Sequence, residues 1–221
     1  MKTRFLTRRS AAAVWFALAA ISLCAADPPS PTPDQAWQLL KDGNERFVAG
    51  RLEGKDVGPL KRKELAAGQH PFAIVLGCAD SRVPPEYVFD RGLGEIFVVR
   101  VAGNVGEPFA LGSIDYAVEH LHVPLIVVLG HEKCGAVAAA LGKTKPQGNL
   151  GKLIDEIHVG GHLADDKDKA LAEAVENNAR HQAESLSERS TVIRQQVQEK
   201  KLQIIAGVYS LETGKVQWLG K

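Results

Sequence analysis

Two stretches of the sequence place metal-ligating and charged side chains directly after an apolar run. The stretch "LGCADSRV" carries Cys78, Asp80 and Arg82, and the stretch "LGHEKCGAV" carries His131 and Cys134. Each follows a run of strand length, so we expect these residues at the carboxyl ends of strands, where α/β sheets gather their ligands. If the two strands are neighbours, two thiols and one imidazole converge on one point.

Zinc is the ion that suits this set of ligands. It takes thiolate sulfur and neutral imidazole nitrogen in tetrahedral geometry, and three protein ligands leave one position open, as in catalytic zinc sites. Structural zinc sites usually close with four ligands from paired C-x-x-C knuckles, which this sequence lacks. We expect Cys134 at the start of a helix, where the helix dipole favours the thiolate.

Simpler readings of the same residues stay open at this point. A cysteine after a strand is often a small buried hydrophobe, and Asp80 with Arg82 would make an ordinary ion pair. In an exported protein, Cys78 and Cys134 would pair in a disulfide. That pairing gives no reason for His131 to lie beside them.

The elements that would position these residues follow from the hydrophobic pattern. Thr32, Pro33 and Gln35 form the start of a helix with a capping box. Its apolar face consists of Trp37, Leu40 and Phe47. A second, short helix is expected in "LKRKELAAGQH", ending near Gly68.

Three apolar runs of strand length, "PFAIVLG", "EIFVVRV" and "PLIVVLG", alternate with helical segments. Such alternation indicates a parallel sheet covered on both faces. Residues 165–201 read as one long or broken helical stretch, and "LQIIAGVYSLETGKVQWL" reads as a strand, a turn and a second strand. We therefore predict an α/β fold with a mostly parallel central sheet flanked by helices, an N-terminal helical arm and a C-terminal strand hairpin.

The N-terminus has the pattern of a secretory signal peptide. A basic head precedes an apolar run of about a dozen residues, shorter than the ~20 that a membrane anchor needs, and small residues lead to Ala26. We predict a signal peptide over 1–26, a single domain over 27–221 and a periplasmic or secreted protein without a stable membrane anchor. Leu23 argues against lipidation of Cys24, and Arg8-Arg9 leaves the twin-arginine route open beside the general one.

Composition sets outer limits on function. The 221 residues allow one domain of ordinary size, and 45% apolar residues are enough for a core. The net charge is +1, and removal of residues 1–26, which hold four basic and no acidic residues, changes it to −3. Without a basic stripe, nucleic acid is not an expected partner.

The paired motifs resemble those of the β-class carbonic anhydrases. "CADSRVPPE", followed about fifty residues later by "GHEKCGAV", is similar to the family pattern C-x-D-x-R and H-x-x-C. The similarity extends to "AWQLLKDGNERFVAG", "GEIFVVRVAGN", "GSIDYAVEHL" and "SLETGKVQWL". It spans nearly the whole chain after residue 26 and is weakest over 142–200.

The resemblance implies a role for each matching position. The zinc ligands would be Cys78, His131 and Cys134, and Asp80 and Arg82 would form a dyad beside the metal. The substrate pocket would include Gln69, Phe97, Tyr116 and the backbone N–H of Gly135. Since Phe97 and Tyr116 match residues that a neighbouring subunit supplies, a homodimer or homotetramer is expected.

The implied activity is the zinc-dependent reversible hydration of carbon dioxide to bicarbonate and a proton by metal-bound hydroxide. Asp80 would accept a hydrogen bond from that hydroxide, and Arg82 would keep the carboxylate off the metal. One bacterial branch of the family binds bicarbonate at a tryptophan three residues before the first cysteine. Val75 stands at that position, which together with Gln69 favours the plant-like branch.

Two other functions remain as alternatives. Relatives of this family hydrolyse carbon disulfide or carbonyl sulfide at the same type of metal site, and the motifs do not separate these substrates from carbon dioxide. A non-catalytic zinc or thiol module of the cell envelope is the alternative from another class, and a metal-free protein with a disulfide would support it.

Overall fold

A five-stranded sheet forms the centre of the structure, a computed structural model that describes residues 30–144 and 146–220. The strand order is β2-β1-β3-β4-β5, in which the first four strands are parallel and β5 is antiparallel to β4. The strands are β1 (Ala73–Gly77), β2 (Ile96–Arg100), β3 (Leu125–His131), β4 (Gln203–Tyr209) and β5 (Val216–Trp218). The predicted fold class is confirmed, including the C-terminal hairpin.

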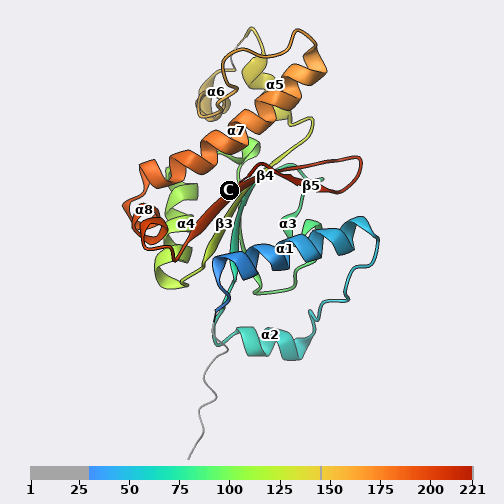
Figure 1. Cartoon of the computed structure of the whole chain (residues 1–221), viewed down its shortest axis with the longest axis vertical. Helices are drawn as coiled ribbons and strands as arrows, with labels where there is room; N and C mark the ends of the chain where they lie inside the picture. Colours follow the sequence, from blue (N-terminus) through green and yellow to red (C-terminus); the bar gives the residue numbers. More distant parts are fainter. Residues whose placement is uncertain (1–29, 145, 221) are drawn as a thin grey trace, which may run out of the picture.

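Helices connect the parallel strands and cover both faces of the sheet (Figure 1). They are α1 (Pro33–Val48), α2 (Pro59–Leu65), α3 (Pro85–Val88), the 3-10 turn η1 (Ala102–Asn104), α4 (Pro108–His120), α5 (Gly135–Leu141), α6 (Gly148–Asp155), α7 (Lys167–Arg189) and α8 (Thr191–Gln198). The short elements α3, η1 and α6 were not predicted, because a helix of one or two turns carries little periodic signal.

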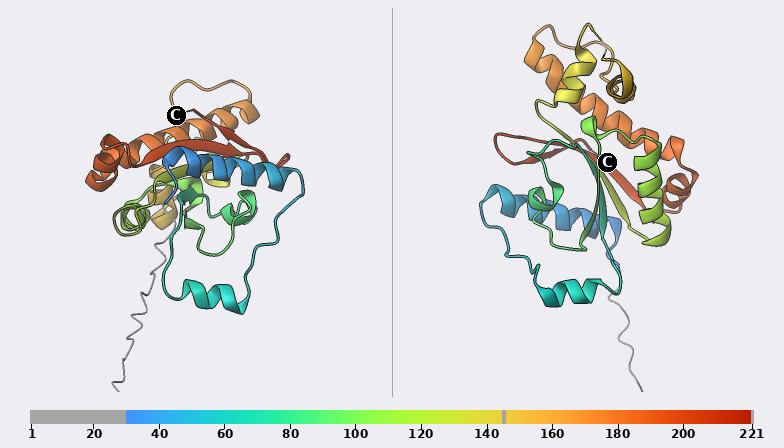
Figure 2. Two further views of the ribbon diagram at one scale, coloured as in Figure 1. Left: turned by 60° about the horizontal axis from the view of Figure 1, so that its bottom comes forward. Right: turned by 180° about the vertical axis from the view of Figure 1, so that it is seen from behind.

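The two faces of the sheet form two hydrophobic layers, which follow from the alternation of side chains along β1. Ile74 and Leu76 belong to a cluster with residues of α4, α7 and α8, such as Ile114. Val75, on the opposite face, belongs to a cluster that contains Leu40 of α1. In Figure 2 (right), α1 lies on one side of the sheet and α4 and α8 lie on the other, while α7 runs across the strand ends, so the sheet is covered on both faces.

Helix α1 begins as predicted. Thr32 accepts from the backbone N–H of Gln35 and its own N–H donates to the Gln35 side chain, which completes the capping box. Leu40 is fully buried, and Trp37 and Phe47 are partly buried against the same cluster. The apolar face of this helix therefore covers its own sheet.

The long C-terminal helical stretch is broken. Ser190 ends α7 and caps α8 by accepting from the backbone N–H of Ile193, and its hydroxyl also donates to Asp115 at 2.6 Å. Helix α7 crosses the carboxyl end of β3. This follows from the close approach at Gly130, where a Cβ would lie 3.4 Å from side-chain carbons of Val175 and Ala179. The fold thus brings α7 close to the strand end that carries His131.

The predicted signal peptide over 1–26 lies outside the described residues. Among residues 30–144 and 146–220, no helix combines the length and the apolar character needed to cross a bilayer.

Candidate metal centre

Three predicted ligands meet where β1 and β3 end. The two strands are hydrogen-bonded neighbours, with Gly77 opposite Leu129, as the convergence of the two motifs required. Cys78 directly follows β1, His131 is the last residue of β3, and Cys134 is the N-cap of α5. Their ligand atoms all lie within 4.8 Å of one another, and all three residues are buried.

The turn between His131 and Cys134 is held by the C-terminal hairpin. Lys133 adopts a left-handed backbone with φ 53°, which reverses the chain so that Cys134 returns towards His131. The Glu132 N–H donates to the Tyr209 carbonyl, and the Glu132 carboxylate accepts from the Ser210 hydroxyl at 3.0 Å. No local pattern in the sequence marks Glu132 as an anchor, because its partners lie 77–79 residues away in the chain.

The imidazole of His131 is oriented for metal binding. Its Nδ1 lies 2.9 Å from the Glu132 carbonyl oxygen, which only accepts hydrogen bonds, so Nδ1 carries the proton. Nε2 is buried and has no hydrogen-bond partner among the described residues. A metal-ligating histidine commonly donates its other N–H to a carbonyl in this way, and the free lone pair of Nε2 faces the two cysteines.

The two cysteines form a pair of free thiols, so the disulfide alternative does not describe this structure. The Cys78 sulfur accepts from the backbone N–H of Asp80 at 3.4 Å and of Gly103 at 3.3 Å. Hydrogen bonding with Cys134 lowers the pKa of Cys78 to about 4 against the effect of burial, and the same contact raises the pKa of Cys134. A divalent cation bound by both sulfurs would displace any proton that remains on the pair.

Asp80 and Arg82 form the predicted dyad beside the three ligands. Asp80 Oδ1 accepts from the backbone N–H and the Nε of Arg82, both at 2.9 Å, and Oδ2 accepts from Nη2 at 2.7 Å. The Arg82 hydrogen bonds hold the pKa of the Asp80 carboxyl well below its usual range. Oδ2 is also 3.9 Å from His131 Nε2. An ionised carboxylate thus borders the metal position, and the guanidinium restrains it.

Arg100 supports the same loop and was not identified from sequence. Its Nε donates to the Cys78 carbonyl at 2.9 Å and its Nη2 donates to the Asp80 carbonyl at 2.5 Å. It ends β2, opposite Gly77. A lone cation at the end of the apolar run "IFVV" is a signal that could have identified this residue.

The predicted substrate residues do not all lie near the ligands of the same chain. Gly135 does, as the first residue of α5. Gln69 precedes β1 and lies near its amino end, whereas the ligands lie at the carboxyl end. Phe97 and Tyr116 pack together with ring centroids 6.4 Å apart, but Phe97 pairs with Ile74, a rise of roughly 13 Å along the strand before Cys78.

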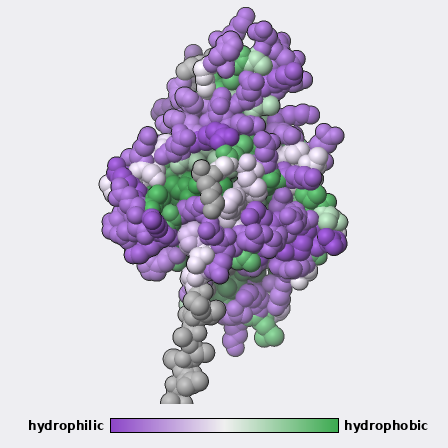
Figure 3. All heavy atoms as spheres, in the orientation of Figure 1, coloured by the Kyte–Doolittle hydropathy of each residue, from purple (hydrophilic) through white to green (hydrophobic). Residues whose placement is uncertain are grey.

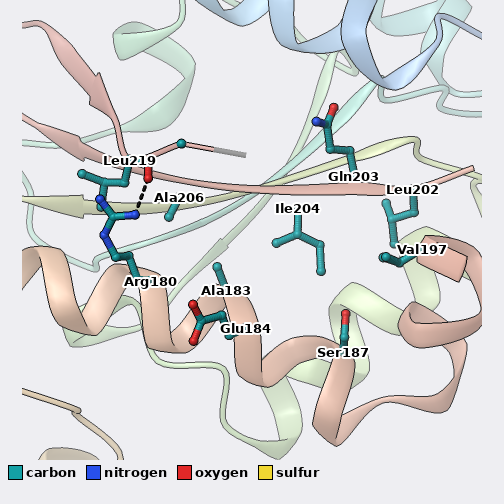
Figure 4. A pocket seen from close by; sticks show the side chains of 11 residues that line it. Arg180, Ala183, Glu184, Ser187, Val197, Leu202, Gln203, Ile204, Ala206 and Leu219 are labelled. Atoms are coloured by element: carbon teal, nitrogen blue, oxygen red, sulfur yellow. Dashed lines mark hydrogen bonds between the residues drawn. The ribbon is translucent and has the colours of Figure 1, made fainter. Parts of the chain in front are cut away.

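A separate pocket of about 380 Å³ lies between α7, α8 and β4 and contains none of these residues. Its floor includes Ile204 and Ala206, and Arg180 donates to the Leu219 carbonyl at its edge (Figure 4). In Figure 3 its apolar atoms form a green patch between α7 and α1 on a mostly hydrophilic face. Among the described residues that line it, no cluster of titratable groups is comparable to the Cys78–His131–Cys134 group.

The types of ligand atom determine which metal ion fits this centre. Two thiols and one imidazole nitrogen, buried and within reach of one point, match the ligands and number of a catalytic zinc site. Oxygen-seeking ions such as magnesium or calcium do not suit sulfur ligands. Zinc is therefore the cofactor that the Cys78–His131–Cys134 group fits.

Comparison with known proteins identifies the family to which this chain is similar. The family model "Carbonic anhydrase" matches residues 73–216. "Carbonic anhydrase 2" of Mycobacterium tuberculosis is 44% identical over 194 residues, which cover 85% of this chain and 93% of that protein. The "Carbonic anhydrase" of Mycolicibacterium smegmatis is 41% identical, with 86% and 94% covered.

Solved structures share the fold. A tetrameric β-carbonic anhydrase from Sordaria macrospora superposes with a TM-score of 0.66 at 26% identity, covering 74% of this chain and 88% of that one. The Coccomyxa β-carbonic anhydrase, solved in complex with acetazolamide, gives a TM-score of 0.65 at 29% identity, covering 72% and 76%. The family model, the relatives that match most of this chain and the Cys-His-Cys centre where β1 and β3 end all agree. This chain therefore belongs to the β-class carbonic anhydrases.

Proposed function

We propose that the protein catalyses the zinc-dependent reversible hydration of carbon dioxide to bicarbonate and a proton. The observation that carries this proposal is the Cys78–His131–Cys134 group with the Asp80 carboxylate beside it, 3.9 Å from His131 Nε2. A zinc ion bound by these ligands supplies Lewis-acid activation of a water molecule near neutral pH.

In this proposal Asp80 orients that water molecule, and the backbone of Gly135 contacts the substrate. Asp80 Oδ2, the carboxylate oxygen nearest to His131, is placed to accept a hydrogen bond from a water molecule at the metal position and would orient that water towards the substrate. The low pKa of Asp80 keeps this oxygen an acceptor throughout the neutral range. The backbone N–H of Gly135, the first residue of α5 after Cys134, would donate to a substrate oxygen.

Arg82 controls the position of Asp80. A carboxylate is itself a competent zinc ligand, so Asp80 would compete with water for the open metal position. The two-point contact of the guanidinium with both carboxylate oxygens holds Asp80 in place.

Gln69, Phe97 and Tyr116 serve the site of a second copy of the chain in this proposal. Gln69 and Phe97 lie far along β1 and β2 from the ligands of their own chain, and Tyr116 packs against Phe97, which supports that arrangement. The proposed assembly is a homodimer or a larger homo-oligomer, and the Sordaria macrospora neighbour is described as tetrameric.

Stopped-flow measurement of carbon dioxide hydration on protein of measured zinc content tests the activity. We expect hydration well above the buffer rate, its loss when a chelator removes zinc and its return when zinc is added back. Carbon disulfide assayed in parallel tests the sulfur-substrate alternative. Zinc-loaded protein that hydrates carbon dioxide no faster than buffer would contradict the proposal, and turnover of carbon disulfide alone would replace it.

We further propose that the protein is exported and begins near Asp27 after cleavage. The basic head, apolar run and small residues of 1–26 support this. Mass spectrometry of protein extracted from the cell envelope is expected to show an N-terminus close to Asp27. An intact Met1 or a lipid on Cys24 would contradict export with cleavage at this position.

A further inference from the structure

Helix α7 carries two buried amide side chains one turn apart, in the part of the chain where the resemblance is weakest. Asn178 is 0% exposed and Gln182 is 1% exposed. Buried polar side chains are costly unless they are hydrogen-bonded, and both of these bond to backbone groups of two loops. They therefore fix the positions of those loops relative to α7.

One of these loops contains η1, which lies against the metal ligands. Asn178 Nδ2 donates to the Gly103 carbonyl at 2.8 Å, and Gln182 Oε1 accepts from the Gly106 N–H at 2.9 Å. The other loop follows α6, where Asn178 Oδ1 accepts from the His158 N–H at 3.1 Å. Asn178 thus bridges η1 and the loop after α6.

Gly103 connects this bridge to the metal centre. Its N–H donates to the Cys78 sulfur at 3.3 Å, while its carbonyl is the group held by Asn178. It has a left-handed backbone with φ 72°, and a Cβ there would lie 2.7 Å from Ile157 Cδ1. A glycine rotates freely about both backbone angles, so the direction of its N–H depends on what holds its neighbouring peptide.

The Gly103 N–H matters because hydrogen bonds to a ligating sulfur tune the metal site. Such a bond withdraws charge from the thiolate, and groups that orient or hydrogen-bond a ligand typically change metal affinity when they are removed. The Cys78 sulfur receives two backbone N–H groups, and Gly103 gives the shorter contact.

We propose that Asn178, supported by Gln182, is a positioning residue of the metal centre that acts through Gly103 on the Cys78 thiolate. This proposal rests on the metal-binding role of Cys78, His131 and Cys134 in the proposed function. It assigns the second half of α7 a role in setting the properties of the metal site, beyond covering the sheet.

The test compares Asn178→Ala with wild type in two measurements on folded protein, neither of which is activity. The first is the rate of zinc release to a chelator, and the second is the thiolate-to-cobalt charge-transfer absorption of the cobalt-substituted protein. We expect zinc release to be about tenfold faster, the lower end of the usual outer-shell effect, because Asn178 acts through one intervening residue. The absorption should move to longer wavelength, because a thiolate with a weaker hydrogen bond donates charge more easily.

Ser190→Ala is the matched control. Ser190 is a buried polar residue at the end of α7, but its hydrogen bonds reach Asp115 and the first turn of α8. It should lower thermal stability and leave both metal measurements unchanged. If Asn178→Ala does not fold, Gln182→Met provides the same comparison, because it removes the acceptor for Gly106 while keeping the volume of the side chain.

The inference is overturned if Asn178→Ala matches wild type in zinc release and cobalt absorption, or if Ser190→Ala changes them to the same degree. Failure of both Asn178→Ala and Gln182→Met to fold would also overturn it, because the amides would then serve the fold as a whole. A wild-type protein that binds neither zinc nor cobalt would overturn the proposed function together with this inference.

Discussion

At the scale of single residues, the centre depends on atoms whose chemistry is set by their immediate neighbours. The Glu132 carbonyl fixes the His131 tautomer, and the two backbone N–H groups on Cys78 stabilise its thiolate. The Asp80–Arg82 contact is the least protected of these arrangements, because the Arg82 side chain is 53% exposed. An exposed ion pair contributes little to the free energy of folding, so the role of this contact is to fix the position of the Asp80 carboxylate.

Arg82→Ala should keep its zinc and lose activity. All three metal ligands remain, but the Asp80 carboxylate loses both guanidinium contacts and keeps only the backbone N–H of residue 82, so it can turn towards the open zinc position. We expect a loss of about 10–100-fold in carbon dioxide hydration, the range for groups that orient a metal site. Arg82→Lys should restore little, since lysine lacks the planar fork.

Zinc content and hydration rate measured on the same samples check this prediction. Lys201→Ala, which breaks the exposed ion pair with Glu199, is the control and should leave both values unchanged. Near-normal activity in zinc-loaded Arg82→Ala would refute the restraining role of Arg82. Loss of zinc would instead show that Arg82 maintains the ligands.

At the scale of elements, α1 is attached to the body of the protein by two polar side chains on its inner face. Asn44 is buried and makes three hydrogen bonds of 2.9–3.0 Å, to the carbonyls of Val88 and Gly214 and from the N–H of Val216. Arg46 Nε donates to the buried carboxylate of Asp90 at 2.6 Å. These contacts hold α1 against the region of α3 and against the hairpin.

Asn44→Ala should destabilise the fold. It leaves two carbonyls and one N–H without partners in a buried site, at a cost of roughly 2–4 kcal/mol in the free energy of unfolding. Urea denaturation monitored by tryptophan fluorescence measures this difference. Gln38→Ala, on the exposed side of the same helix, is the control. Equal stability of Asn44→Ala and wild type would mean that α1 is not held by these bonds.

Asp90→Asn should lower stability in a way that depends on pH. Burial alone would raise the pKa of Asp90, but the Arg46 hydrogen bond and the Glu53 N–H outweigh it, so the folded pKa is lowered. A carboxyl with a lowered folded pKa stabilises the fold above its unfolded pKa of about 3.9 and loses that contribution as pH falls through the folded value. Asparagine tolerates the left-handed backbone of this position, where φ is 47°.

We expect Asp90→Asn to be less stable than wild type by roughly 1–3 kcal/mol at pH 7. The difference should shrink below about pH 4. Urea denaturation of both proteins across this range measures it, and the comparison at each pH isolates Asp90 because the two proteins share every other titratable group. A difference that stays constant down to pH 3 would show that the carboxylate charge is not what stabilises the contact.

At the scale of the whole molecule, the proposed function makes one chain an incomplete site, and the surface around β2 is consistent with a second copy. The edge strand β2 is only partly buried along its whole length, and Tyr116 beside it is 48% exposed. Gln69 lies at the end of β1 away from the metal ligands. A second copy that covers this edge would bury apolar surface and bring these side chains to its own metal centre, as expected for a symmetric interface.

Subunit complementation tests this arrangement. Gln69→Ala and Cys134→Ser should each impair activity as pure proteins, the first by loss of a substrate contact and the second by loss of a ligand. A heterodimer of the two contains one site with every residue intact and should recover about half of the wild-type activity per dimer. Co-expression with two affinity tags and sedimentation analysis provide the defined heterodimer.

The control for complementation pairs two variants whose substituted residues both belong to the metal centre of their own chain. Asp80→Asn with Cys134→Ser should not complement, because both residues serve the metal of their own chain. A heterodimer of Gln69→Ala and Cys134→Ser that stays as inactive as its parents, or a fully active monomer, would contradict the shared site.

Local patterns in the sequence determined the elements and the ligand types. The capping box of α1, the apolar runs of β1 and β3, and the cysteines and histidine directly after or at their ends are all encoded by residues close together in the chain. They were predictable because capping, strand burial and ligand chemistry depend on side-chain type and short spacing. The roles of Asp80 and Arg82 rested on the family resemblance, and the structure shows the contact between them.

The tertiary structure decided which of these local features meet. Because β1 and β3 are neighbours, the two motifs form one centre. Gln69 stays at the opposite end of β1 from the ligands of its own chain. The contacts of Arg100 with the Cys78 loop and of Asn178 with Gly103 join residues 22 and 75 positions apart. No local pattern encodes such pairs, because they arise from the order of strands in the sheet and from the packing of α7 across their ends.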